Sequence, residues 1–123
     1  MHMLMKSDVV QVKGRLDRFR DLIYIDDVIQ GWERVLYGKA YNQTFNLGTG
    51  VRTSFEDLIR TTAEVMGKSD RLVINQLEGT PGDMLGSVAD ITHIREAVQY
   101  SPRYPLKDGL KEMWDWVRES GRF

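Results

Sequence analysis

The spacing of hydrophobic residues changes several times along the chain, and it predicts short strands that alternate with helices. Residues 9–13 (VVQVK) are β-branched and nearly alternating, which favours a strand that ends at Gly14. The short apolar runs 22–25 (LIYI), 44–47 (TFNL) and 72–75 (LVIN) are also typical of strands. Strands that alternate with helical patterns predict the fold class α/β, or mixed α+β.

The first predicted helix follows Asp26 and Asp27. A carboxylate at the N-cap or in the first turn accepts backbone N–H groups that have no partner within the helix, so both residues are interpreted as capping residues. A metal site or an acid/base pair made of the same two carboxylates is the less favoured alternative. The apolar stripe of this helix comprises Val28, Ile29, Trp32, Val35 and Leu36.

Three more helical segments follow. Thr53 and Glu56 have the spacing of a capping box at the start of the second helix, and Gly67 is placed to end it. Asp90 is expected to cap a short helix, and residues 106–120 form the last one. The side chains expected to point inward are Phe55, Leu58, Ile59, Thr62, Val65 and Met66 in the second helix, and Leu110, Met113, Trp114 and Val117 in the last.

Composition narrows the possible functions. The 123 residues suffice for one domain, and 41% hydrophobic with 28% charged residues is typical of a globular chain. A net charge of −1 argues against nucleic-acid binding, and no apolar run reaches the about 18 residues of a membrane span. The chain has no cysteine, so a cytoplasmic location is expected. Residues 1–8 are set apart as the start of the chain or a cloning remnant.

The loop 79–86 (GTPGDMLG) has three glycines between a strand-like and a helix-like run, as a phosphate-binding loop would. The spacing Gly79-x-x-Gly82-x-x-x-Gly86 does not match the dinucleotide fingerprint G-x-G-x-x-G. Asp83 would also repel a diphosphate by about 1 kcal/mol per charge pair in watery surroundings. The loop is therefore not a pyrophosphate cradle, and an ordinary connection remains an alternative.

Several weaker candidates are better explained by structure than by chemistry. The GTG at 48–50 could bind an anion at a helix start, but a tight turn is the simpler interpretation. His93 has no second His or Cys nearby, so no metal site is predicted. Trp32, Trp114 and Trp116 have helical spacing and are expected in the core or at an interface.

Arg15, Arg18 and Arg20 lie close together in the turn after the first strand. They could form a solvated face. A guanidinium at a strand start is equally suited to a diphosphate, which it can contact through two hydrogen bonds. The residues themselves leave both interpretations open.

Three segments occur in a familiar order: RFRDLIYIDDV at 18–28, TFNLGTGVRTSFEDL at 44–58 and GTPGDMLGSVAD at 79–90. Together they resemble the C-terminal part of the NAD-dependent epimerase/dehydratase family, extended short-chain dehydrogenases of the UDP-glucose 4-epimerase kind. The resemblance implies that residues 9–123 form the nucleotide-sugar-binding C-terminal portion of such an enzyme. It also implies an incomplete Rossmann domain, with short strands and three to four helices.

The resemblance implies the site residues as well. Arg20 falls on the family's diphosphate-binding arginine, and Asp83 on the acid that accepts hydrogen bonds from the nucleotide ribose. Thr80 replaces a second diphosphate-binding arginine, and Lys13 replaces an aromatic residue that often packs on the base. Gln11, on the same strand as Lys13, completes the expected substrate-binding set.

The family's catalytic residues have no counterpart in the chain. None of its five tyrosines is followed four residues later by the lysine that would lower the tyrosine pKa, and the N-terminal NAD fingerprint is absent. The chain alone is therefore expected to be inactive, with no catalytic residue, metal or cofactor of its own; NAD would be bound in the full-length family. The alternative is a non-enzymatic binding or interaction module, or a truncated remnant.

The resemblance also implies that two segments lack the structural elements that pack beside them in the family. In the family, the segment that matches TFNL is a strand of the Rossmann sheet, and the helix from Asp27 packs beside it. Without the rest of that sheet, a strand edge and an apolar helix face would be exposed, and such surfaces favour association. The chain is expected to form a homo-oligomer through them.

Overall fold

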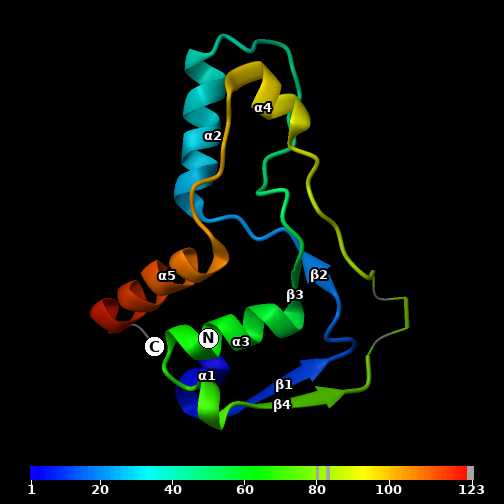
Figure 1. Cartoon of the computed structure of the whole chain (residues 1–123), viewed down its shortest axis with the longest axis vertical. Helices are drawn as coiled ribbons and strands as arrows, with labels where there is room; N and C mark the ends of the chain where they lie inside the picture. Colours follow the sequence, from blue (N-terminus) through cyan, green and yellow to red (C-terminus); the bar gives the residue numbers. More distant parts are fainter. Residues whose placement is uncertain (80, 83, 122–123) are drawn as a thin grey trace.

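A computed structural model of the chain describes residues 1–79, 81–82 and 84–121. It has two packed halves, with five α-helices and short strands among these residues (Figure 1). The lower half contains a parallel pair of strands in which Val10 lies opposite Ile74 and Lys13 opposite Leu77. Its elements are α1 (His2–Lys6), β1 (Val9–Lys13), α3 (Phe55–Val65), the 3-10 turn η1 (Ser69–Arg71) and β4 (Val73–Leu77).

The core of the lower half lies between one face of this sheet and the helices α1 and α3. Leu4 of α1, Val10 and Val12 of β1, and Ala63 of α3 are all buried there. Because side chains alternate along a strand, Gln11 and Lys13 lie on the opposite, exposed face of the sheet.

The upper half is built around a second cluster of buried residues. The helices α2 (Ile25–Tyr37) and α4 (Thr92–Val98) lie side by side there, with the chain before β3 descending next to them (Figure 1). The helix α5 (Leu106–Ser120) returns toward the lower half and packs on α3. The buried residues of this cluster are Ala40, Ile91, Ile94, Val98 and Tyr100.

A two-residue antiparallel ladder joins the halves. The strands β2 (Phe19–Arg20) and β3 (Thr53–Ser54) pair with Phe19 opposite Ser54 and Arg20 opposite Thr53. Phe19 also bridges to Gly86, so the chain after the glycine loop is held against β2.

Two of the four predicted strands are confirmed and two are wrong. The strand 9–13 is β1, and 72–75 corresponds to β4, shifted by one residue at its start. Residues 44–47 form no ladder; Phe45 and Leu47 instead pack against the upper cluster. Residues 22–25 form no ladder either, and Ile25 begins α2. Both runs have strand-like side chains, but a strand also needs a neighbour for its backbone groups.

The predicted helix starts require correction. The N-cap of α2 is Tyr24, which makes no side-chain capping bond, so Asp26 and Asp27 lie within the first turn and the predicted N-cap is wrong. The capping pair of α3 is Ser54 and Asp57, one residue later than predicted: Ser54 Oγ accepts a hydrogen bond of 3.0 Å from the Asp57 N–H.

The predicted helix ends and faces are partly confirmed. Gly67 ends α3 with a φ of +67°, a conformation that glycine adopts without strain. The last helix has the predicted bounds, and Val117 is buried. Met113 was expected to point inward but is exposed. The helix α1, within the residues 1–8 that were set apart, contributes Leu4 to the core.

Candidate functional site

The loop 79–86 is anchored at both ends beside the chain that joins β1 to β2. At its start, a Cβ placed on Gly79 would lie 2.7 Å from the Cα of Gly14, so only glycine allows this approach. At its end, the Phe19 N–H donates to the Leu85 carbonyl over 3.0 Å. A Cβ on Gly86 would lie 2.5 Å from the Phe19 carbonyl oxygen. One end of the loop is therefore fixed beside the C-terminal end of β1, and the other end is fixed beside β2.

The predicted site residues fall on the elements that meet here. Lys13 is the last residue of β1, and Arg20 is on β2, where it is half-buried. Gln11 lies two residues before Lys13 on the same exposed face of the sheet. Thr80 and Asp83 lie outside the described residues.

The three neighbouring arginines have different partners. Arg15 forms an ion pair with Asp17, and Arg18 donates to the carbonyls of Lys13 and Arg15 while its guanidinium lies 4.9 Å from the centre of the Phe55 ring. Within the described part of the chain, Arg20 makes one side-chain hydrogen bond, of 2.7 Å, from Nη1 to the adjacent Phe19 carbonyl. Arg20 therefore has the most hydrogen-bond donors left for an anion, since a guanidinium carries five.

Several hollows among the described residues lie away from these elements. Four hollows of about 360 to 700 Å³ are formed mostly by the segments around α2 and α5, and neither Gln11, Lys13 nor Arg20 lines any of them.

The GTG turn at 48–50 holds a carboxylate of the chain itself. Asp21 Oδ1 accepts from the N–H and the hydroxyl of Thr49, and Asp21 Oδ2 accepts from the N–H groups of Gly50 and Ala89. Burial acts to raise the pKa of Asp21, but these four hydrogen bonds outweigh it and hold that pKa below its ordinary value. The backbone donors that a phosphate would need here are already used, which supports the tight-turn interpretation.

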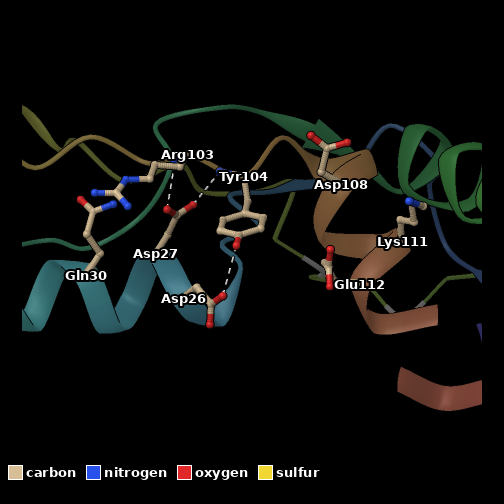
Figure 2. A pocket seen from close by; sticks show the side chains of 8 residues that line it. All are labelled: Asp26, Asp27, Gln30, Arg103, Tyr104, Asp108, Lys111 and Glu112. Carbon is tan, nitrogen blue, oxygen red and sulfur yellow. Dashed lines mark hydrogen bonds between the residues drawn. The ribbon is translucent and has the colours of Figure 1, made fainter. Parts of the chain in front are cut away.

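A polar hollow of about 480 Å³ lies between the N-terminal ends of α2 and α5 (Figure 2). Asp27, at its wall, is fully buried and accepts from the backbone N–H groups of Arg103 at 2.8 Å and Tyr104 at 3.0 Å. Asp26 accepts from the Tyr104 hydroxyl instead. The two carboxylates thus hold the segment that leads into α5.

The tyrosines whose pKa departs from the ordinary value are poor bases. Burial, reinforced by Asp27 and Asp21, raises the pKa of Tyr100 to about 12. Burial also raises the pKa of Tyr24, and the hydrogen bond to Asp26 raises that of Tyr104. A tyrosine that abstracts a proton near neutral pH needs the opposite shift.

The part of the chain that the structure describes contains neither a candidate metal site nor a candidate membrane-spanning helix. No group of three His, Asp or Glu side chains there is arranged to hold a metal ion. His93, for which the sequence predicts no metal site, packs on Phe45 and contacts the Gln43 side chain. No helix within the described ranges is long and apolar enough to cross a membrane.

In sequence, the chain is similar to part of a UDP-glucose 4-epimerase and to part of a GDP-L-fucose synthase. The UDP-glucose 4-epimerase of Mycolicibacterium smegmatis is 30% identical over 122 residues, which cover 97% of this chain and 37% of the relative. A putative GDP-L-fucose synthase of Arabidopsis thaliana is 25% identical over 116 residues. These residues cover 93% of this chain and 34% of that relative. No protein-family model matches the chain.

A solved structure agrees with these relatives. UDP-glucuronic acid 4-epimerase from Bacillus cereus, as a variant in complex with NAD and UDP-4-deoxy-4-fluoro-glucuronic acid, superposes with a TM-score of 0.82 and 30% identity. The match covers 97% of this chain and 38% of that enzyme. The chain is a distant homologue of the NAD-dependent epimerases and dehydratases.

The homology extends over little more than a third of the length of these relatives. The mixed α/β fold expected from the sequence is confirmed, and it matches about that share of an extended short-chain dehydrogenase structure. The sequence patterns missed Asp21 as the residue that joins three distant segments. Its position directly after Arg20 carries no signal of this role, because all four donors belong to Thr49, Gly50 and Ala89.

Proposed function

We propose that residues 9–123 are the nucleotide-sugar-binding, C-terminal portion of an NAD-dependent epimerase or dehydratase. The observation that supports this most strongly is the anchoring of the loop 79–86 to Gly14 and Phe19, next to Arg20, within a fold shared with UDP-sugar epimerases. The ligand is a nucleoside-diphosphate sugar of the UDP-sugar kind, because the solved relative was obtained with such a compound.

Each predicted residue has a role in this proposal. Arg20 contacts the diphosphate through a charge-assisted hydrogen bond, and Asp83 accepts from the ribose hydroxyls. Lys13 adds positive charge near the diphosphate, and Gln11 and Thr80 supply neutral hydrogen bonds. The described geometry of Gln11, Lys13 and Arg20 is compatible with a ligand lying across the ends of β1 and β2.

One argument against NAD binding by this chain alone comes from its glycine turn at 48–50. The glycine turn at 48–50 directs its N–H groups to Asp21, so it cannot hold the NAD pyrophosphate without losing that contact. The tyrosine pKa values raised by burial and by Asp26 are unsuited to proton abstraction. We therefore propose that the chain alone neither binds NAD nor catalyses epimerisation.

Calorimetric titration of the whole chain with UDP, UDP-glucose and NAD tests the proposal. We expect weak binding of UDP-glucose, weaker binding of UDP, and no heat from NAD. Arg20→Ala and Asp83→Ala should each weaken UDP-glucose binding by about tenfold or more, as expected when a charge-assisted hydrogen bond is lost.

Arg15→Ala is the matched control for Arg20→Ala. It removes the same charge five residues earlier in the chain, but the Arg15 guanidinium is already paired with Asp17. Equal losses in Arg15→Ala and Arg20→Ala would mean that general positive charge, rather than a site at Arg20, attracts the nucleotide. Absence of any nucleotide binding by the unmodified chain would reject the proposal.

A second candidate function is an interaction module that self-associates without nucleotide chemistry. It is favoured by the exposed apolar face of α2 and by the residues 44–47, which pair with no strand in the described structure. Calorimetry separates the two functions, since an interaction module need not bind any nucleotide.

A further inference from the structure

The antiparallel pairing of β2 and β3 extends beyond the two residue pairs of the ladder. Arg20 lies opposite Thr53 within the ladder. The Phe55 N–H donates to the Arg18 carbonyl over 2.8 Å, which continues the same pairing and brings Arg18 opposite Phe55. Because side chains alternate along paired strands, Arg18, Arg20 and Phe55 are directed to the same face of the ladder.

Arg18 and Phe55 form a stacked pair on this face. The Arg18 guanidinium lies 4.9 Å from the centre of the Phe55 ring, within the range of a cation–π contact. Arg18 Nε donates to the Arg15 carbonyl over 3.3 Å, and Arg18 Nη2 donates to the Lys13 carbonyl over 2.6 Å. Both members of the pair are only half-buried, so part of it is open to solvent. The pair is therefore a flat, positively charged surface whose position is set before any ligand binds.

Arg20 and the Arg18–Phe55 pair are suited to two different parts of one nucleotide. Residues two positions apart on an extended strand are separated by about 6.6 Å, a distance that the ribose of a nucleotide can bridge. Arg20 presents hydrogen-bond donors, which suit a diphosphate. Arg18 directs two of its donors to backbone carbonyls and presents the flat face of its guanidinium, on which a base can stack.

We infer that the base of the bound nucleotide stacks on the Arg18–Phe55 pair while its diphosphate contacts Arg20. This inference rests on the proposed function and adds to it the part of the site that holds the base. Stacking on a planar side chain tolerates every base, because each base has a π face, whereas discrimination needs hydrogen bonds to the base edges. The chain should therefore bind uracil and guanine nucleotides with affinities within about tenfold of each other.

Calorimetric titration of the whole chain with UDP, GDP and ribose 5-diphosphate tests the inference. Ribose 5-diphosphate keeps the ribose and the diphosphate of UDP but lacks the base. We expect UDP and GDP to bind about tenfold or more tighter than ribose 5-diphosphate, because stacking of one base contributes about that much. Arg18→Lys keeps the charge and removes the planar group, so it should weaken UDP and GDP binding by about tenfold and leave ribose 5-diphosphate binding unchanged.

Arg52→Lys is the matched control. The Arg52 guanidinium lies 4.1 Å from the centre of the Phe19 ring, so these two residues form a second pair of the same kind. Phe19 lies between Arg18 and Arg20 in the chain and is therefore directed to the opposite face of the ladder. Arg52→Lys should leave the binding of all three ligands unchanged. Equal weakening by Arg18→Lys and Arg52→Lys would overturn the inference.

Phe55→Leu is a second variant, and it leaves the two hydrogen bonds of the Arg18 guanidinium in place. It replaces the ring beneath the guanidinium with a smaller apolar side chain that offers no π face. UDP and GDP binding should weaken severalfold, and ribose 5-diphosphate binding should not change. Circular dichroism and thermal unfolding should show that this variant and Arg18→Lys remain folded.

The outcomes separate this inference from the proposed function. UDP binding that Arg20→Ala weakens, but that neither Arg18→Lys nor Phe55→Leu changes, would overturn the inference and leave the proposed function standing. A preference of more than about a hundredfold for UDP or GDP would also overturn it, because such a preference requires hydrogen bonds to the base edges. Absence of any nucleotide binding by the unmodified chain would reject both.

Discussion

The helices α2 and α3 are both amphipathic, yet they turn opposite sides toward the protein. Helix α3 buries Ala63 against β1 and α1, with Ile59 and Met66 packed beside it. Helix α2 instead buries Asp27 and Gln30. The lower half of the molecule is thus held mainly by apolar packing. Helix α2 contacts the upper half through hydrogen bonds of its buried polar side chains as well as through Val35, which packs against the upper cluster. The comparison teaches that an apolar stripe identifies a helix without deciding which of its sides is covered.

Asp27→Ala is the substitution expected to have the largest effect. It leaves the N–H groups of Arg103 and Tyr104 without their buried acceptor, so we expect a loss of about 4 kcal/mol in the free energy of unfolding. Urea unfolding measures it. Asp26→Ala is the control, because Asp26 is exposed and accepts only from the Tyr104 hydroxyl among the described contacts. Equal effects of the two substitutions would show that the polar side of α2 does not hold the upper half.

Leu4→Ala tests the apolar packing of the lower half. Leu4 is 1% exposed, and its truncation should lower the free energy of unfolding by about 3 kcal/mol through lost burial and a residual cavity. Met3→Ala, at an exposed neighbour in the same helix, should change it by less than about 0.5 kcal/mol. If Leu4→Ala were as mild as Met3→Ala, residues 1–8 would not belong to the folded unit.

Asp21→Asn probes the contact that joins the chain after β2 to the GTG turn and to Ala89. The amide cannot accept all four hydrogen bonds, so we expect a loss of about 2 kcal/mol near neutral pH, measured by urea unfolding. The pKa of Asp21 is lower in the folded state than its ordinary value of 3.8. Its contribution is therefore complete above pH 3.8 and is lost as the pH falls through the folded pKa.

The difference between the unmodified chain and Asp21→Asn should accordingly shrink in acid. Unfolding curves at neutral pH and below the ordinary carboxyl pKa provide the comparison. A difference that stays constant with pH would mean that the ionised carboxylate of Asp21 is not what holds the GTG turn.

Ser54→Ala should have the smallest of these effects. Ser54 Oγ accepts from the Asp57 N–H, and loss of such a cap lowers stability by about 1 kcal/mol. Glu56→Ala, in the capping position that the sequence predicted, should lower it by less than about 0.5 kcal/mol, since Glu56 makes an exposed ion pair with Arg60. Thermal unfolding of both variants distinguishes the observed cap from the predicted one; a larger effect at Glu56 would favour the prediction.

The candidate site was predictable only in part. The resemblance selected the segments that carry Lys13, Arg20 and the loop 79–86, and the ends of that loop do contact Gly14 and Phe19; the binding role of these residues stays a proposal. The partners of the three arginines could not be predicted, since Arg15 and Arg18 differ from Arg20 only in which neighbours the turn brings to them. Asp21 was missed for the same reason: its donors lie 28 to 68 residues away in the sequence.

The sequence by itself determined the elements whose signals are local. The strand at 9–13, the end of α3 at Gly67 and the last helix at 106–120 follow from side-chain periodicity and from backbone conformations that few residues adopt. Only the tertiary structure decided that 44–47 pairs with no described strand, that α2 buries its polar side, and that Asp27 binds the 103–104 backbone. These outcomes depend on which distant groups come within hydrogen-bonding distance, and a local pattern carries no information about that.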